Sequence, residues 1–100
     1  MPVLVKIHDL YRKIVAVCDT ELLGKKFEEE NLQLDVNEKF YGGKEFKDDQ
    51  VIKLLKDAQT DDACFNFVGE NSIALGVKAG IIDKNCVIKI QNIPHAMALL

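Results

Sequence analysis

The sequence predicts an α+β domain with a mixed β-sheet of about five to six strands and two to three helices. Three observations predict this class. Short β-branched segments alternate between apolar and polar residues, two other segments have helical spacing, and glycines or capping residues mark most boundaries. With 100 residues, of which 48% are hydrophobic and 29% charged, the chain can bury one core. We therefore expect a single globular domain over residues 1–100.

The first two strands are expected to form a hairpin. Residues 3–9 alternate between apolar and polar positions, and residues 13–18 form a β-branched run. Only a few residues separate the two segments. An antiparallel hairpin that turns near Leu10–Arg12 is the simplest connection.

The next segment combines a short helix with two short strands. Asp19 is predicted to cap a helix that ends at Gly24 in a left-handed conformation. Residues 31–36 alternate as a half-exposed strand does, and residues 38–41 read as a further strand that stops at Gly42-Gly43. The acidic run 28–30 is expected to be a solvated loop.

The C-terminal half predicts two helices and two strands. Apolar residues at 51, 54, 55 and 58 form one helical stripe over residues 49–58, with Asp48 as the predicted cap. The remaining elements are a central strand at 63–68, a helix from Asn71 or Ser72 to Ala79 that Gly80 closes, and a last strand at 86–91 before Pro94. Alternation within 73–77 also fits a strand. The segment 63–91 is predicted to be a βαβ unit with a right-handed parallel crossover.

Charge is distributed unevenly. The net charge is −3, with +2 in residues 1–18, −5 in residues 19–49 and zero in residues 50–100. Strong non-specific binding to nucleic acid requires a basic surface, which the chain as a whole lacks. Its first segment can still form a small local patch from Lys6, Arg12 and Lys13.

The three cysteines and two histidines do not predict a metal site or a cofactor. Cys18, Cys64 and Cys86 include no C-x-x-C pair, and their number is odd. Without a signal peptide ahead of Val3, reduced thiols and a cytoplasmic location are expected. A metal site from His8, His95, Cys18 and Asp19 lacks the usual close ligand pairs. No apolar run reaches the roughly 20 residues that cross a bilayer, so no membrane partner is expected.

The junction Val68-Gly69-Glu70-Asn71-Ser72 suggests two roles. A strand leads through glycine into a helix start, where free amides can bind an anion such as phosphate. Neither a dinucleotide fingerprint nor a phosphate-loop motif is present. The alternative is that Ser72 or Asn71 caps its own helix.

Three other local features each have a functional and a structural interpretation. Cys18 at a strand-to-helix junction could be a nucleophile with His8 or His95 as its base, or a small buried residue. Tyr41 in Phe40-Tyr41-Gly42-Gly43 could stack on a base, or close the edge of the core. Pro94 in Ile93-Pro94-His95-Ala96 could make a rigid turn that presents His95, or simply stop the last strand.

Five motifs together carry a family resemblance. They are Cys18-Asp19-x-Glu21-Leu22-Leu23-Gly24-Lys25, Phe40-Tyr41-x-Gly43, Val68-Gly69-Glu70-x-Ser72-Ile73, Gly80-Ile81-Ile82-Asp83 and Ile93-Pro94-His95-Ala96. In this order and spacing the chain resembles the archaeal domain-of-unknown-function 424 family over nearly its whole length. The resemblance implies a small cytoplasmic archaeal protein without an established activity. A link to RNA or translation follows only by analogy with other compact archaeal families.

Three functional hypotheses follow. The first is a non-enzymatic module that binds RNA or a ribonucleoprotein partner. The second is an enzyme that acts on a phosphorylated or acyl compound through Cys18 or His95. The third is a structural adaptor. The candidate binding residues are Tyr41, Gly69, Glu70, Ser72, His95, Cys18 and Asp19, and the oligomeric state stays open.

Overall fold

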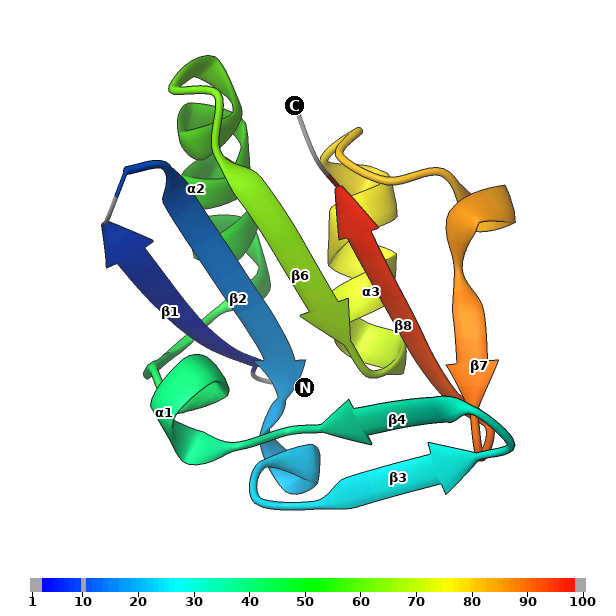
Figure 1. Ribbon diagram of the computed structural model, residues 1–100. Helices are drawn as coiled ribbons and strands as arrows, with labels where there is room; N and C mark the ends of the chain where they lie inside the picture. The colour runs from blue at the N-terminus through cyan, green and yellow to red at the C-terminus, as the bar shows by residue number, and fades with distance from the viewer. Residues whose placement is uncertain (1–2, 10, 99–100) are drawn as a thin grey trace.

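The computed structural model describes residues 3–9 and 11–98, and it confirms the predicted α+β class (Figure 1). In chain order its elements are β1 (Val3–Asp9), β2 (Lys13–Asp19), the 3-10 turn η1 (Thr20–Leu22), β3 (Lys26–Glu29), β4 (Leu32–Asp35), α1 (Glu38–Tyr41), β5 (Lys44–Phe46), α2 (Asp48–Thr60), β6 (Cys64–Val68), α3 (Glu70–Lys78), the 3-10 turn η2 (Lys84–Cys86), β7 (Ile88–Ile90) and β8 (Ile93–Ala98). Six strands form a mixed sheet in the order β5-β1-β2-β6-β8-β7, and β3 pairs with β4 separately.

The sheet contains both predicted supersecondary units. β1 and β2 form the expected antiparallel hairpin, although Leu10 of the predicted turn lies outside the described residues. β2 and β6 pair in parallel, and β8 lies antiparallel to both β6 and β7. β6 and β7 therefore run in the same direction on either side of β8. The C-terminal βαβ unit is present in a split form, with the last strand inserted between its two strands.

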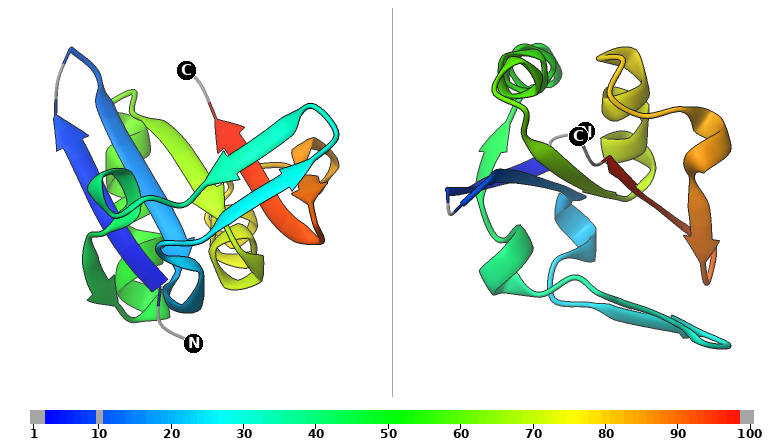
Figure 2. Two further views of the ribbon diagram at one scale, coloured as in Figure 1. Left: turned by 60° about the horizontal axis from the view of Figure 1, so that its bottom comes forward. Right: turned by 45° about the horizontal axis from the view of Figure 1, so that its top comes forward.

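Helices α2 and α3 cover one face of the sheet, and α1 with the β3–β4 hairpin covers part of the other (Figure 2). One core cluster joins α2 and α3 to one face and includes Val15 and Val17, and a second joins α1 and β4 to the other and includes Ala16 and Cys18. Successive side chains of a strand point to opposite faces. Because both faces are covered here, residues 15–18 of β2 are all apolar or cysteine and all buried, and the strand ends at the buried Asp19.

Residues 38–41 form helix α1, so the predicted strand is wrong. The side chain of Asn37 accepts a hydrogen bond from the Phe40 amide at 2.8 Å, and the helix ends where Gly42 N–H bonds to the Glu38 carbonyl. A side-chain oxygen at the N-cap accepts one of the first-turn amides that have no partner within a helix, which favours a helix here. Gly43 then brings the chain against β1, where an added Cβ would lie 2.0 Å from the Val5 carbonyl oxygen.

Three strands were not predicted. β3 contains part of the expected acidic loop, and Glu29 Oε1 accepts the Gln91 amide at 3.1 Å. β5 pairs with β1 at the edge of the sheet. β8 contains Pro94, which was expected to stop a strand or make a turn. Proline has no N–H to donate to the neighbouring strand. It is tolerated here because the Gly69 carbonyl, its would-be acceptor, accepts the Ile73 amide of α3 at 2.9 Å instead. The Pro94 carbonyl still accepts from Gly69 N–H.

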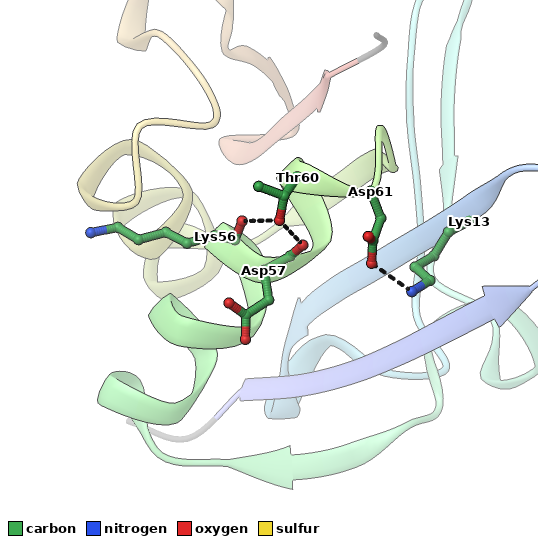
Figure 3. Close-up of polar contacts among 5 residues, drawn as sticks. All are labelled: Lys13, Lys56, Asp57, Thr60 and Asp61. Carbon is green, nitrogen blue, oxygen red and sulfur yellow. Dashed lines mark hydrogen bonds and ion pairs between the residues drawn. The ribbon is translucent and has the colours of Figure 1, made fainter.

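Helices α2 and α3 match their predicted positions closely. α2 begins after Lys47, whose amide donates to the Gln50 side chain at 3.2 Å, so the cap lies one residue before the predicted Asp48. At its other end Thr60 Oγ1 donates to the Asp57 carbonyl, and Asp61 forms an ion pair with Lys13 of β2 at 3.2 Å (Figure 3). None of the helices in the described part of the chain has the length and apolar composition needed to cross a membrane.

Candidate functional site

The carboxyl ends of β2 and β6 meet at the start of α3, where Asp19 is buried. Its Oδ1 accepts the backbone amide and the hydroxyl of Ser72, both at 2.8 Å. Its Oδ2 accepts the backbone amide of Asn71 at 3.1 Å and the side-chain amide at 3.2 Å. A carboxylate from one strand therefore satisfies free amides at the first turn of a helix that begins 51 residues later.

Gly69 is the residue that permits this approach. Its φ is +106°, and a Cβ added there would lie 2.3–2.6 Å from the carboxylate atoms of Asp19. Any side chain would displace the carboxylate, and the backbone conformation itself favours glycine. Gly69 is thus explained by the contact between β2 and α3.

This junction corrects two predictions. Asp19 precedes η1, but its side chain makes no bond to that turn and caps α3 instead. Asn71 and Ser72 do not cap their own helix, because both lie inside its first turn and the N-cap residue is Gly69, which has no side chain to accept a hydrogen bond. The amides expected to bind an external anion are bonded to the protein's own carboxylate.

The hollow beside the junction is acidic. It has a volume of about 390 Å³ and is lined by residues of η1, the start of α3 and the β7–β8 turn, among them Asp19, Glu21 and Glu70. Its lining includes no lysine or arginine from the described residues. A phosphate there would face carboxylates without a compensating cation, so the hollow does not suit an anion.

Cys18 is fully buried on the opposite face of the sheet from Asp19. Its thiol donates to the Tyr41 carbonyl at 3.8 Å. Burial raises the pKa of the Cys18 thiol to about 12, and the nearby charges of Asp19 and Glu21 act in the same direction. A nucleophilic cysteine requires a lowered pKa and access to substrate, and Cys18 has neither.

The histidines do not lie in position to act as a base for Cys18. Cys18 pairs with Val68 on one side, and His95 pairs with Val68 on the other. Two strand spacings, roughly 10 Å, therefore separate their backbones. His8 is level with Ile14, four residues along β2 from Cys18 and thus roughly 13 Å away. The geometry gives no support to the catalytic hypothesis for Cys18.

Tyr41 and His8 pack with α1 on the same face as Cys18. Tyr41 is buried, with its ring edge-on to Phe40, and burial followed by the Cys18 charge raises the pKa of its phenol. Because the Tyr41 ring is buried, a nucleobase cannot stack on it, and the structural interpretation, that Tyr41 closes the edge of the core, is the one that fits. His8 stacks on Phe40 at 4.8 Å between ring centroids, and its Nε2 lies 2.9 Å from the Phe40 carbonyl oxygen.

Glu70 and His95 occupy different faces of the sheet. Glu70 is exposed in the first turn of α3, where an acid is favourable near the positive end of the helix. His95 is half-buried in β8 and its Nδ1 lies 3.0 Å from the Phe67 carbonyl oxygen. Burial lowers the pKa of His95, and this hydrogen bond partly opposes the effect. The candidate residues therefore form two groups rather than one site.

Part of the sheet face opposite α2 and α3 is uncovered. The α1 and hairpin layer packs over one end of this face, and the other end is visible in Figure 1 as the upper half of β1, β2, β6 and β8. We call this surface the open face; strand register places on it the side chains of Lys6, His8, Ile14, Cys64, Asn66, His95 and Met97. Arg12 reaches over it, with Nη1 3.7 Å from Cys64 Sγ.

Sequence reasoning found only part of the open face. Lys6, Arg12 and His95 were named, but Asn66 and Met97 were not, and Lys13 turns to the opposite face to pair with Asp61. The missing signal was the relative register of β6 and β8, which depends on the unpredicted strand. No group of three or more His, Cys, Asp or Glu side chains suited to a metal ion lies within residues 3–9 and 11–98.

The comparisons with known proteins agree with this fold and name no activity. Among curated proteins, none matches the chain. An uncharacterized conserved protein from Methanopyrus kandleri has a crystal structure similar to this one, with a TM-score of 0.86 and 27% sequence identity, covering 97% of this chain and 90% of that one. The family model described as protein of unknown function (DUF424) matches residues 7–100. Because that match covers nearly the whole chain and agrees with the motif resemblance, the protein belongs to the DUF424 family.

Proposed function

We propose that this protein is a non-enzymatic module that binds single-stranded RNA on the open face. The observation that carries the proposal is the charge of that surface. Lys6 and Arg12 lie over it, and none of the open-face residues named above is a carboxylate. The carboxylate of Glu45 in β5 is on the same side of the sheet but opposite Leu4, toward the end that α1 covers. The charge of the open face thus differs from that of the whole chain, which contains 16 acidic residues and 13 basic ones.

The open face offers the contacts that single-stranded RNA requires. Lys6 and Arg12 are suited to phosphates, and the Asn66 amide can both donate to and accept from a base edge. Met97 is 57% exposed and gives an apolar surface on which a base can lie. Tyr11, fully exposed at the β1–β2 turn beside Arg12, supplies an aromatic ring for stacking.

With few cations on the open face, RNA binding should depend only weakly on salt concentration. With two cations at the site, the logarithm of the affinity should fall with the logarithm of salt concentration with a slope of roughly −1.4 for a single strand. This is a shallow dependence, so contacts to bases must provide much of the affinity. Unstructured RNA should therefore bind more tightly than a duplex of the same length, whose base edges are less accessible.

Fluorescence anisotropy with a labelled, unstructured 12-nucleotide RNA at 50 and 200 mM salt tests the proposal. The double variant Lys6→Gln/Arg12→Gln should weaken binding roughly tenfold at low salt, since two phosphate contacts are lost. Lys53→Gln/Lys56→Gln removes two exposed cations from α2 on the other face and serves as the matched control, with less than roughly twofold change. Absence of binding at 50 mM salt, or an equal loss in the control, would exclude the open face as an RNA site.

A further inference from the structure

A groove lies beside α3 on the other face of the sheet. It has a volume of about 580 Å³, within the usual range for binding pockets. It is lined by Glu70, Ile73, Ala74, Val77 and Lys78 of α3, by Lys84 and Val87 of the following segment, by Lys89 of β7 and by Pro94 of β8. It shares only Glu70 and Pro94 with the acidic hollow and contains none of the open-face residues.

The groove marks a vacant position in the helical layer. α3 packs on β2, β6 and β8, and α2 lies on the side of β1 and β2. The same face of β7 therefore extends past α3 without a helix over it, as the right view of Figure 2 shows. The nine residues of α3 span roughly 13 Å, which is the length of two to three turns of a neighbouring helix.

The floor of the groove is apolar. Ile73 and Val77 are one helical turn apart on α3 and face Val87 and Pro94 across the groove. All of these except Pro94 are only half-buried, and the exposed Ala74 leaves room between them. Such a surface suits the apolar side of an amphipathic helix, whose anchors recur at three- and four-residue spacing.

The rim of the groove is basic although the protein is acidic. Lys78, Lys84 and Lys89 with Glu70 give the lining a charge of +2, whereas the whole chain carries −3. Within residues 3–9 and 11–98, these three lysines form no ion pair with a carboxylate. Lys78 and Lys84 lie at the C-terminal end of α3 and Glu70 at its N-terminal end. Lys89 is opposite Pro94, which bonds to Gly69 just before α3, so it lies at the same end as Glu70. The net positive charge is therefore at the end where α3 finishes.

We propose that this groove docks an amphipathic helix of a partner protein that carries carboxylates in its N-terminal turn. The apolar anchors would contact Ile73, Val77 and Val87, and the carboxylates would lie near Lys78 and Lys84. Acidic residues favour the first turn of a helix, so the docked helix runs antiparallel to α3. This surface is separate from the open face, and the inference does not rest on RNA binding.

A synthetic 16-residue helix with leucines at helical spacing and three glutamates in its first turn is the probe. Titration of the isotope-labelled full chain should shift the backbone amide resonances of Ile73, Val77 and Val87. The same peptide with the glutamates replaced by lysines should bind at least roughly tenfold more weakly, because like charges then meet at the rim. Ala74→Arg, which fills the groove from an exposed position, should weaken binding to a similar extent.

Matched variants make each outcome decisive. Lys78→Glu/Lys84→Glu should weaken binding roughly tenfold, whereas Lys53→Glu/Lys56→Glu and Gln59→Arg, all on α2, should change it less than roughly twofold. The proposal is overturned if the peptide leaves the groove resonances unchanged, or if the lysine peptide binds equally well. It is also overturned if the groove resonances shift with protein concentration alone, as self-association of the chain would cause. RNA affinity should be unchanged in Ala74→Arg, which separates this site from the open face.

Discussion

The Asp19–α3 junction and the open face differ in how their polar groups are satisfied. At the junction every oxygen of one carboxylate is bonded to the backbone or side chain of Asn71 or Ser72. On the open face, half-exposed polar side chains and an exposed methionine are turned to solvent. The motif around Gly69 therefore holds β2, β6 and α3 together, while the surface that we propose binds RNA is spread over four strands.

Removal of the junction carboxylate should have the largest effect on stability. Asp19→Ala leaves the buried Ser72 amide and hydroxyl without their acceptor, and we expect the free energy of unfolding to fall by about 2–4 kcal/mol. Urea denaturation followed by circular dichroism measures this. Asp19→Asn retains one oxygen acceptor and should lose about 1–2 kcal/mol. If Asp19→Ala is as stable as the wild type, the junction does not hold α3 as we describe.

Two glycine substitutions separate backbone strain from the junction contact. Gly69 and Gly80 both have positive φ, but only at Gly69 would a Cβ meet the Asp19 carboxylate, whereas no atom lies within 4 Å of one at Gly80. Gly80→Ala should cost about 1 kcal/mol for the strained backbone alone. Gly69→Ala should cost about 2–3 kcal/mol, since the carboxylate must also move. Thermal and urea unfolding of both variants test the difference, and equal losses would contradict it.

The buried thiol should make stability fall at alkaline pH. The pKa of Cys18 is about 12 in the folded protein and 9.0 ordinarily. As pH rises above 9, the unfolded chain loses this proton while the folded chain keeps it, so the unfolded state is favoured. The slope is at most about 1.4 kcal/mol per pH unit for one thiol. Urea denaturation at pH 8, 9 and 10 should show a shallower decrease for Cys18→Ala, and identical slopes would exclude this contribution.

Substitutions on the open face should affect stability least. Lys6→Gln and Met97→Gln replace side chains that face solvent, so their free energies of unfolding should lie within about 0.5 kcal/mol of the wild type. Their effect should appear in RNA affinity instead. A large loss of stability in either variant would mean that the open face belongs to the packed core, and the contrast with the junction would then fail.

Much of the fold could be predicted because local signals agreed with the tertiary structure. The hairpin, the central strand and helices α2 and α3 all have an apolar pattern of the correct period with a boundary residue at the end. Gly24 has the left-handed conformation expected of it, and Gly80, which was expected to close α3, follows the end of that helix. In these segments the packing partners require what the local sequence already favours.

The errors arose where a distant segment decides the local structure. Residues 38–41 are too few for a period to distinguish a strand from a helix, and the Asn37 cap decides it. Pro94 can lie within a strand because the Gly69 carbonyl opposite it accepts from the Ile73 amide and needs no donor from residue 94. The acidic run lies partly in β3, and the turn at Gln91 accounts for the contact of Glu29. Neither the β2–α3 junction nor the cross-strand composition of the open face can be read without the register of the sheet.

The tethered carboxylate at α3 also determines what the helix can bind. Asp19 and the α3 amides belong to one chain, so the carboxylate competes as an intramolecular ligand at a high effective concentration. A free phosphate or carboxylate would have to displace it from four hydrogen bonds and leave it buried without partners. The Asp19 carboxylate thus occupies the position at the start of α3 where an external anion would otherwise bind. An external anion therefore has no free backbone amide of Asn71 or Ser72 to bind at this helix start.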